Sequence, residues 1–323
     1  MNPLAATVRG FGRALSAARG PRLSILIFHR VLPALDPLLP GEPDAALFKA
    51  RMRWLASAFH VMPLTEAVRR LADGNLPVNA ACITFDDGYA DNATIAAPLL
   101  SKLRLPATFF IATGFLDGGR MWNDTVIEAI RVARGPRLDL ASIGLDEWPC
   151  GNIAERVATI AGLLDRLKYL PQSERRRKVD AIASAVGLAA QSDLMMTRRQ
   201  VSELPRYGMA VGGHTVTHPI LTTLGIDDVR QEVADGRRDL EQTLGEPVRL
   251  FAYPNGRPRR DYDATHVALI HEMGFDAAVA TAWGVADRGS DRFQLPRFTP
   301  WDASVNRFGL RLAHNLTRRP ELV

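Results

Sequence analysis

The chain has 323 residues, of which 47% are hydrophobic and 23% are charged, and this balance excludes disordered, collagen-like and low-complexity proteins. The longest apolar runs, such as LSILIF at residues 23–28, are far shorter than the ~20 residues of a membrane span. The net charge is +5, and two cysteines are too few for a disulfide framework or a cysteine metal cluster. We therefore expect a soluble, intracellular protein with reduced thiols.

Residues 1–22 are predicted to form an N-terminal leader helix, because apolar side chains recur every three or four residues, at Leu4, Val8, Phe11 and Leu15. Arg9 and Arg13 interrupt the continuous apolar stretch that a secretory signal requires. A packed or solvated helix is the favoured interpretation, and contact of its arginines with an anionic membrane surface is the alternative.

Short apolar strands alternate with helices along the rest of the chain. Strands are predicted at residues 24–28, 80–85, 107–112, 209–211, 249–253 and 277–280, and helices at residues 48–59, 64–71 and 92–103. This alternation predicts an α/β fold with a parallel sheet or barrel. Residues 124–200 are helical, charged and poor in strands, so we expect a helical insertion. The predicted barrel spans residues 23–310 and a C-terminal tail spans residues 311–323.

Three polar clusters follow predicted strands, at the end of the barrel where active sites are built. The first is TFDDGY at residues 84–89, in which Asp86 and Asp87 can take different tasks, one as a base and one as a metal ligand. An ordinary Asp-Asp-Gly turn is the alternative interpretation of this dipeptide.

The second cluster is GGHTVTHP, in which the spacing of His214 and His218 predicts two imidazoles on one side of a helical turn. Together with a carboxylate from another strand end, they would form a two-histidine, one-carboxylate metal site. The third is FAYPNG at residues 251–256, whose turn can present backbone N–H groups to an oxyanion, although it is also an ordinary turn.

These motifs together resemble the polysaccharide deacetylase (NodB-homology) family of metal-dependent carbohydrate esterases, over residues 23–298. The resemblance implies a distorted (β/α) barrel of about seven parallel strands. It implies that Asp86 is the catalytic base, that Asp87, His214 and His218 bind the metal, and that the amide of Asn255 holds the oxyanion. Tyr253 belongs to the same motif and is a candidate substrate-binding residue.

Two features depart from the common family pattern. The position of the arginine that tethers the base in many members is Ala252 here, and Arg297 in QLPRF is a candidate replacement, with an ordinary surface arginine as the alternative. A late Leu-x-His motif is not evident, since His314 lies in a predicted C-terminal helix. His29 in ILIFHRV is therefore the candidate general acid, because it resembles the early Tyr-His motif of the exopolysaccharide branch, in which the motif order is permuted. A strand-capping histidine is the alternative.

Aromatic and acidic residues elsewhere are candidates for the sugar cleft, namely Trp122, Asp124 and Trp301, although large rings are more often core residues. The ion is expected to be Zn²⁺, with Co, Ni or Mn compatible with the same ligands.

The predicted function is metal-dependent hydrolysis of N-acetyl groups on an aminosugar, in a polysaccharide or its lipid-linked precursor. The alternatives are an amidase for a small non-sugar amide and a non-catalytic glycan-binding barrel. We expect a glycan or lipid-linked sugar as the partner and no nucleic acid, because the +5 charge is spread along the chain. A cytoplasmic location is expected, with contact at the inner membrane surface as a hypothesis. The sequence does not specify an oligomeric state.

Overall fold

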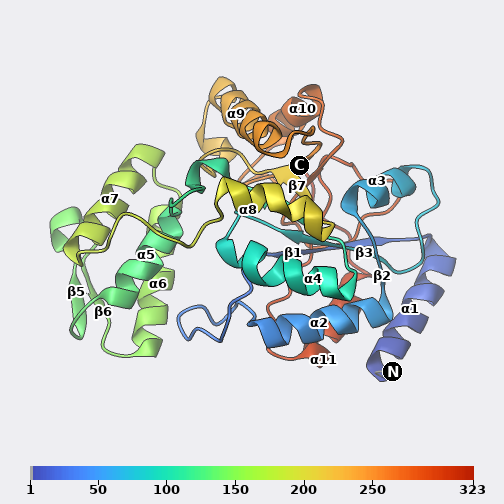
Figure 1. Ribbon diagram of the computed structural model, residues 1–323, viewed down its shortest axis with the longest axis horizontal. Coiled ribbons are helices and arrows are strands. Elements are labelled where there is room, and N and C mark those ends of the chain that lie inside the picture. The colour runs from blue at the N-terminus through green and yellow to red at the C-terminus, as the bar shows by residue number, and fades with distance from the viewer. Residues whose placement is uncertain (1–2) are drawn as a thin grey trace.

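The computed structural model describes residues 3–323 and is built around a curled parallel sheet (Figure 1). The sheet has seven strands: β1 (Leu23–Phe28), β2 (His60–Val61), β3 (Ala80–Phe85), β4 (Thr108–Ile111), β7 (Ala210–Gly213), β8 (Leu250–Ala252) and β9 (Ala277–Val279). The order is β1-β3-β4-β7-β8-β9, and β2 pairs with the start of β3. The predicted distorted (β/α) barrel is confirmed, and strands covered on both faces explain the continuous apolar runs.

An irregular segment, residues 295–298, links the last strand of the sheet to the first. Leu295 forms a parallel bridge with Val279 of β9, and Phe298 forms a parallel bridge with Leu26 of β1. The backbone N–H of Phe298 donates to the carbonyl of Ile25 at 2.7 Å. Arg297 therefore lies in the segment that joins the two edges of the sheet.

Alternate residues of the strands pack into two different apolar clusters. One contains Ile25, Cys82, Phe110, Ala252 and Val279, and the other contains their strand neighbours and the surrounding helices. This is the two-residue period of a strand, in which successive side chains point to opposite faces. Following the same period from Cys82 through Thr84 directs Asp86 toward the first cluster, at the end of β3.

Helices surround the sheet, and there are more of them than the three predicted from the sequence. They are α2 (Ala45–Ala58), α3 (Leu64–Ala72), α4 (Ala97–Leu103), α8 (Arg198–Glu203), α9 (Ile226–Leu244) and α10 (Ala264–Glu272). A π-helical turn (Asn92–Ala96) precedes α4, and short 3-10 turns occupy Thr113–Phe115, Ala141–Ile143, Leu204–Tyr207 and Leu221–Thr223. Asp44 caps α2 by accepting a hydrogen bond from the N–H of Leu47, as expected for an N-cap aspartate.

The insertion forms a separate layer beside the barrel, at the left of Figure 1. It comprises α5 (Trp122–Val132), β5 (Arg137–Asp139), β6 (Glu147–Pro149), α6 (Ile153–Lys168) and α7 (Gln172–Ala185). Its helices pack around their own apolar cluster, which includes Ile130, Leu163 and Ile182. The antiparallel pair β5–β6 differs from the helical prediction, because these strands are only three residues long and too short to give a periodic signal.

The two terminal helices pack against each other. Helix α1 (Pro3–Arg19) contacts both α2 and α11 (Val305–Asn315), and it buries Ala5 and Val8. The predicted tail at residues 311–323 begins inside α11, where Leu312 is buried, so its N-terminal part belongs to this packed layer. Within residues 3–323, no helix combines the length and the apolar character needed to cross a membrane.

Candidate active site

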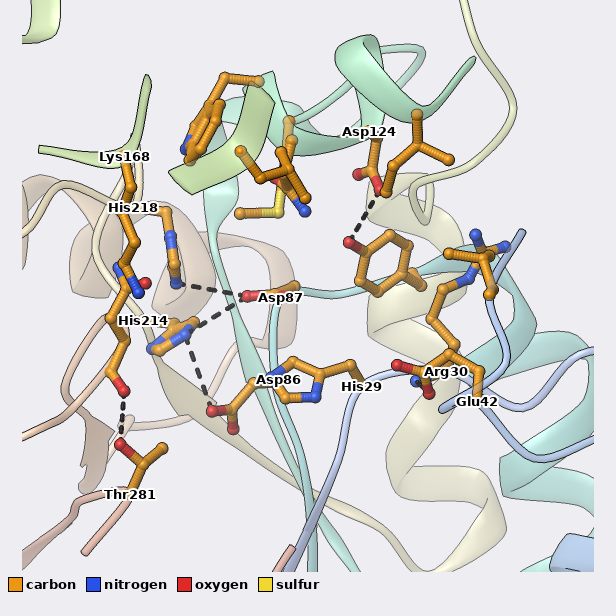
Figure 2. Close-up of a pocket in the computed structure, with 18 of the residues that line it drawn as sticks. His29, Arg30, Glu42, Asp86, Asp87, Asp124, Lys168, His214, His218 and Thr281 are labelled. Carbon is orange, nitrogen blue, oxygen red and sulfur yellow. Dashed lines mark hydrogen bonds and ion pairs between the residues drawn. The ribbon is translucent and has the colours of Figure 1, made fainter. Parts of the chain in front are cut away.

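A cavity of about 500 Å³ opens where the carboxyl ends of the strands meet (Figure 2). Much of its polar lining comes from residues in the segments after five strands: His29 after β1, Asp86 and Asp87 after β3, His214 and His218 after β7, Asn255 after β8 and Thr281 after β9. The structure thus brings residues from distant parts of the chain into one site, as parallel strands of a barrel do.

Asp86 is held by a buried arginine. Nη1 and Nη2 of Arg297 donate to the two carboxylate oxygens of Asp86, each at 2.7 Å, and Nε of Arg297 donates to the carbonyl of Ala280 at 3.0 Å. Burial by itself raises the pKa of Asp86, but Arg297 and His214 outweigh it and hold that pKa below its usual range. The carboxylate is therefore ionised and fixed in orientation, as a positioned base requires.

Asp87, His214 and His218 form a compact group whose candidate ligand atoms all lie within 4.8 Å of one another. Oδ1 of Asp87 is 3.5 Å from Nε2 of His214 and 3.4 Å from Nε2 of His218. Burial alone would raise the pKa of Asp87, but the nearby imidazoles of His214 and His218 bring it well below its usual range. Burial lowers the pKa of His218 to about 4, which favours the neutral imidazole.

The loop after β7 is not the helical turn predicted from the spacing of its histidines. Thr215 and His218 both have a positive φ, at 66° and 52°, so the chain reverses irregularly between the two imidazoles. Asp87 has a φ of 77° as well, which turns its side chain out of the alternation of β3. Positive φ is unusual in residues other than glycine, and such backbone strain gathers at functional sites.

Glu232 of α9 organises this loop, and it was not recognised from the sequence. Its Oε2 accepts hydrogen bonds from the backbone N–H groups of Val216 and Thr217, at 2.9 and 2.8 Å, and its Oε1 accepts from the Thr217 hydroxyl. Gly236, one turn further along α9, lets the helix approach, because a Cβ there would lie 2.9 Å from the carbonyl of Thr215. Glu232 lies inside a helix, 16 residues from Val216, and no sequence motif connects the two.

The three residues fit a divalent metal ion. Oδ1 of Asp87 is buried and has no hydrogen-bond partner among residues 3–323, as expected of a ligand atom. Nδ1 of His214 lies 2.7 Å from the carbonyl oxygen of Ala252, and an imidazole that donates there presents Nε2 to a metal. Two imidazoles and one carboxylate are a donor set that leaves positions open for water and substrate.

His29 lies on the opposite side of Asp86 from the His214 imidazole (Figure 2). Among the described residues, none forms a hydrogen bond with the His29 ring. The backbone carbonyl of His29 accepts a hydrogen bond from the side chain of Asn92 at 2.8 Å. Glu42 lines the same part of the cavity. Burial raises the pKa of Glu42, although His29 and the backbone N–H of Arg30 oppose that shift. Glu42 lies in a proline-rich loop, where no sequence pattern singled it out.

The third motif divides between the cavity and the core. Asn255 lines the cavity with a φ of 59°, and its carbonyl accepts a hydrogen bond from the Thr281 hydroxyl. Tyr253 does not line it. Its ring is fully buried and stacks on Tyr262 with 4.1 Å between ring centroids, and its hydroxyl donates to the carbonyl of Phe293. The structure therefore places the Tyr253 side chain in the core and not among the residues that line the cavity.

The insertion supplies one wall of the cavity. Trp122 and Asp124 of α5 line it, together with Leu164 and Lys168 of α6. Trp301 lies elsewhere. It is 50% exposed and packs against Trp283 with 4.8 Å between ring centroids, so the structure does not place it in the cleft.

A buried polar network lies beside the metal-binding group. The Tyr89 hydroxyl donates to Oδ1 of Asp124 at 3.1 Å, and the guanidinium of Arg30 stacks over the Tyr89 ring while its Nε donates to Asp91. Burial, with the nearby charge of Asp87, raises the pKa of Asp124 to about 7. Arg30 and Asp91 lie next to the His29 and TFDDGY motifs. The sequence did not identify them as site residues, because nothing in it distinguishes them from the residues of an ordinary ion pair.

A polysaccharide deacetylase family model matches residues 73–133 and 172–278, which is slightly more than half of the chain. The chain belongs to the polysaccharide deacetylase family. The family model skips residues 134–171, so the core of the insertion, including β5, β6 and α6, lies outside the region that this family shares. This deacetylase is accordingly a hydrolase of amide bonds in the N-acetyl groups of sugars.

Individual relatives are distant in sequence but similar in fold. YxkH of Bacillus subtilis (strain 168) is 20% identical over 278 residues, covering 85% of this chain and 70% of YxkH. The Streptococcus pyogenes deacetylase PplD, in complex with acetate, superposes with a TM-score of 0.60 at 19% identity, covering 90% of this chain and 98% of PplD. IcaB from Ammonifex degensii superposes with a TM-score of 0.57 at 20% identity, covering 90% and 97%.

Proposed function

We propose that this protein is a metal-dependent N-deacetylase that removes acetyl groups from an aminosugar in a polysaccharide or its lipid-linked precursor. The observation that carries this proposal is the pairing of two carboxylates with different environments in one cavity. Asp86 is bound on both oxygens by Arg297, whereas Oδ1 of Asp87 lies bare between two imidazoles. One carboxylate is thus suited to proton transfer and the other to metal binding.

Asp87, His214 and His218 would hold the ion, and Zn²⁺ is the best match to this donor set. A bound divalent ion would supply Lewis acidity to the acetyl carbonyl and lower the pKa of a coordinated water. Asp86, ionised and oriented by Arg297, accepts the proton of the attacking water. The backbone N–H of Asn255 stabilises the charge that develops on the acetyl oxygen.

His29 donates the proton that the leaving amine needs. It reaches the cavity from the end of β1, whereas Asp86 reaches it from the end of the adjacent β3, so the base and the acid follow neighbouring strands.

Trp122 offers a ring face for the sugar at the wall formed by the insertion, as aromatic side chains in sugar sites commonly do. We place the protein in the cytoplasm, with the exposed face of α1, including Phe11 and Arg13, as the candidate surface for the inner membrane.

The test is acetate release from a panel of chito-oligosaccharides, lipid-linked aminosugars and small non-sugar amides, using protein purified without chelators. Release from one of the two sugar classes, lost on treatment with EDTA and restored by Zn²⁺, supports the proposal. Release from the small amides alone would make the protein a general amidase. A chelator-insensitive rate, or no release from any substrate by metal-loaded protein, would contradict a metal-dependent deacetylase.

A further inference from the structure

A second cavity adjoins the candidate active site, and Trp122 lines both. It has a volume of about 380 Å³ and is formed mainly by the insertion. Its polar side chains include Arg120, Gln172, Arg175 and Arg176, and we call it the arginine groove. Gln172 donates a hydrogen bond to the Thr217 hydroxyl at 3.1 Å, which connects the groove to the residue preceding His218.

Arg175 is the central residue of the arginine groove, and it is buried without a counter-ion. Arg175 is only 7% exposed. Its guanidinium stacks over the Trp122 ring, 5.1 Å from the ring centroid. Nη1 donates to the carbonyl of Lys168 at 2.9 Å. Within residues 3–323, no carboxylate forms an ion pair with it, and burial lowers the pKa of Arg175 with no acidic group to offset the shift. A buried charge without a partner is costly, so its presence beside a cavity points to an anionic ligand that would pair with it.

The other charges of the groove leave it positive. Arg120 donates to the Thr125 hydroxyl and to the carbonyl of Ala189, both neutral acceptors. Arg176 is exposed, and Nε is 3.9 Å from the carboxylate of Asp180, the one acidic residue among those lining the groove. Three arginines therefore face a single carboxylate.

We propose that the arginine groove binds an anionic group of the substrate, a phosphate or a carboxylate, while the N-acetyl sugar occupies the neighbouring cavity with its ring against Trp122. This inference rests on the proposed deacetylase function and adds the charge of its substrate. A planar guanidinium binds both groups through paired N–H donors, and stacking on Trp122 fixes the plane of Arg175 in advance.

Two kinds of substrate carry an anionic group that the arginine groove would bind. A phosphate would come from a sugar linked to a lipid or nucleotide diphosphate, and a carboxylate would come from a uronic acid next to the aminosugar in a polymer. Acetate release is therefore to be compared among UDP-N-acetylglucosamine, lipid-diphosphate-linked N-acetylglucosamine, an oligosaccharide of alternating glucuronic acid and N-acetylglucosamine, and neutral chitotetraose.

The decisive quantity is the ratio of kcat/KM for an anionic substrate to that for chitotetraose. We expect a ratio of about 10 or more for the native protein with at least one anionic substrate, and we expect Arg175→Gln to bring this ratio down to about one, mainly through KM. Arg175→Lys should retain part of the preference, because it keeps the charge but loses the paired donors. Thermal unfolding of each variant checks that the insertion remains folded.

Arg199→Gln is the matched control, since Arg199 is an exposed arginine of α8 that pairs with Glu203 outside both cavities. It should leave the ratio unchanged. The inference would be overturned by a ratio near one for every anionic substrate, or by a folded Arg175→Gln variant that keeps the native ratio. In either case, acetate release from chitotetraose would still support the proposed function. Equilibrium binding of N-acetylglucosamine 1-phosphate and of N-acetylglucosamine to Asp86→Asn measures the same charge preference without turnover. If no substrate releases acetate, the proposed function fails, and with it the inference that rests on it, whatever those titrations show.

Discussion

Arg297 binds Asp86 through two hydrogen bonds of 2.7 Å, although 211 residues separate them in the chain. The contact exists because residues 295–298 join β9 to β1 and carry the Arg297 side chain into the barrel beside the end of β3. Both side chains are buried, so the pair is weakly screened by solvent. This contact fixes both the orientation and the charge of the candidate base.

Replacing Arg297 by methionine should therefore impair catalysis and alter its pH dependence. We expect kcat/KM to fall about 100-fold, because the base loses its orientation. Loss of the guanidinium raises the pKa of Asp86, so the acid limb of the pH–rate profile should move to higher pH. A buried carboxylate left without a partner should also lower the free energy of unfolding by about 3–5 kcal/mol. The profile and urea unfolding measure these effects.

The control for Arg297 is Arg51→Lys. Arg51 is equally buried and donates to the carbonyl groups of Pro300 and Asp302, and it neither lines the cavity nor forms an ion pair with Asp86. It should lose stability without a shift of the acid limb. An Arg297→Met profile identical to that of the native protein would contradict the assignment of Asp86 as the base that Arg297 controls.

Asp86→Asn and His214→Ala should separate proton transfer from metal binding. Asp86→Asn removes the base but none of the three proposed ligands, so we expect bound metal with a rate about 100- to 10,000-fold lower. His214→Ala removes a ligand, so metal content and activity should fall together. Elemental analysis of the purified variants and acetate release give the two readouts. Full activity of Asp86→Asn would rule out its role as base.

His29→Gln tests the proposed general acid through the leaving group. We expect the rate on an acetylated aminosugar to fall about 100-fold with the metal content unchanged, because the amine must be protonated to leave. An acetyl ester with a good leaving group, such as 4-nitrophenyl acetate, needs no such proton and should be affected much less. His60→Gln, on the exposed β2, should change neither rate. Equal losses on both substrates would contradict an acid role.

Glu232→Gln tests how the His214–His218 loop is positioned. The carboxylate accepts from two backbone N–H groups and one hydroxyl, and an amide can replace only one of its two acceptor oxygens. We expect metal affinity to weaken about 10-fold, with activity largely recovered at saturating metal. Metal titration followed by activity measures this, and Glu246→Gln, exposed beyond the end of α9, is the control. An unchanged metal affinity would show that the loop holds its shape without Glu232.

Asp124 should make stability depend on pH. Its pKa is raised to about 7 by burial, from an ordinary value of 3.8, so its contribution to stability is complete below about pH 4 and is lost as pH rises through 7. In metal-free protein, Asp124→Asn should therefore gain stability relative to the native chain between pH 5 and 8, by up to a few kcal/mol. Urea unfolding across this range measures the difference. A difference independent of pH would contradict a raised pKa for Asp124.

The sequence predicted six of the seven strands of the main sheet, because these are short apolar runs, and it missed β2, which has only two residues, neither of them buried. The runs at 23–28 and 80–85 coincide with β1 and β3, and polar residues directly after them had to lie at the carboxyl end of the sheet. The helical turn predicted from the spacing of His214 and His218 is wrong, since spacing alone does not distinguish a turn of helix from an irregular loop with positive φ.

The sequence by itself therefore determined the α/β class, the family, and the residue types available for an ion and a base, because these depend on local patterns and on motifs. The tertiary structure alone decided which residues meet. It brought Arg297 onto Asp86, Glu232 beneath the histidine loop, and Arg175 beside Trp122, and it placed Tyr253 in the core. Such contacts depend on how distant segments pack, and packing leaves no periodic signal in the chain.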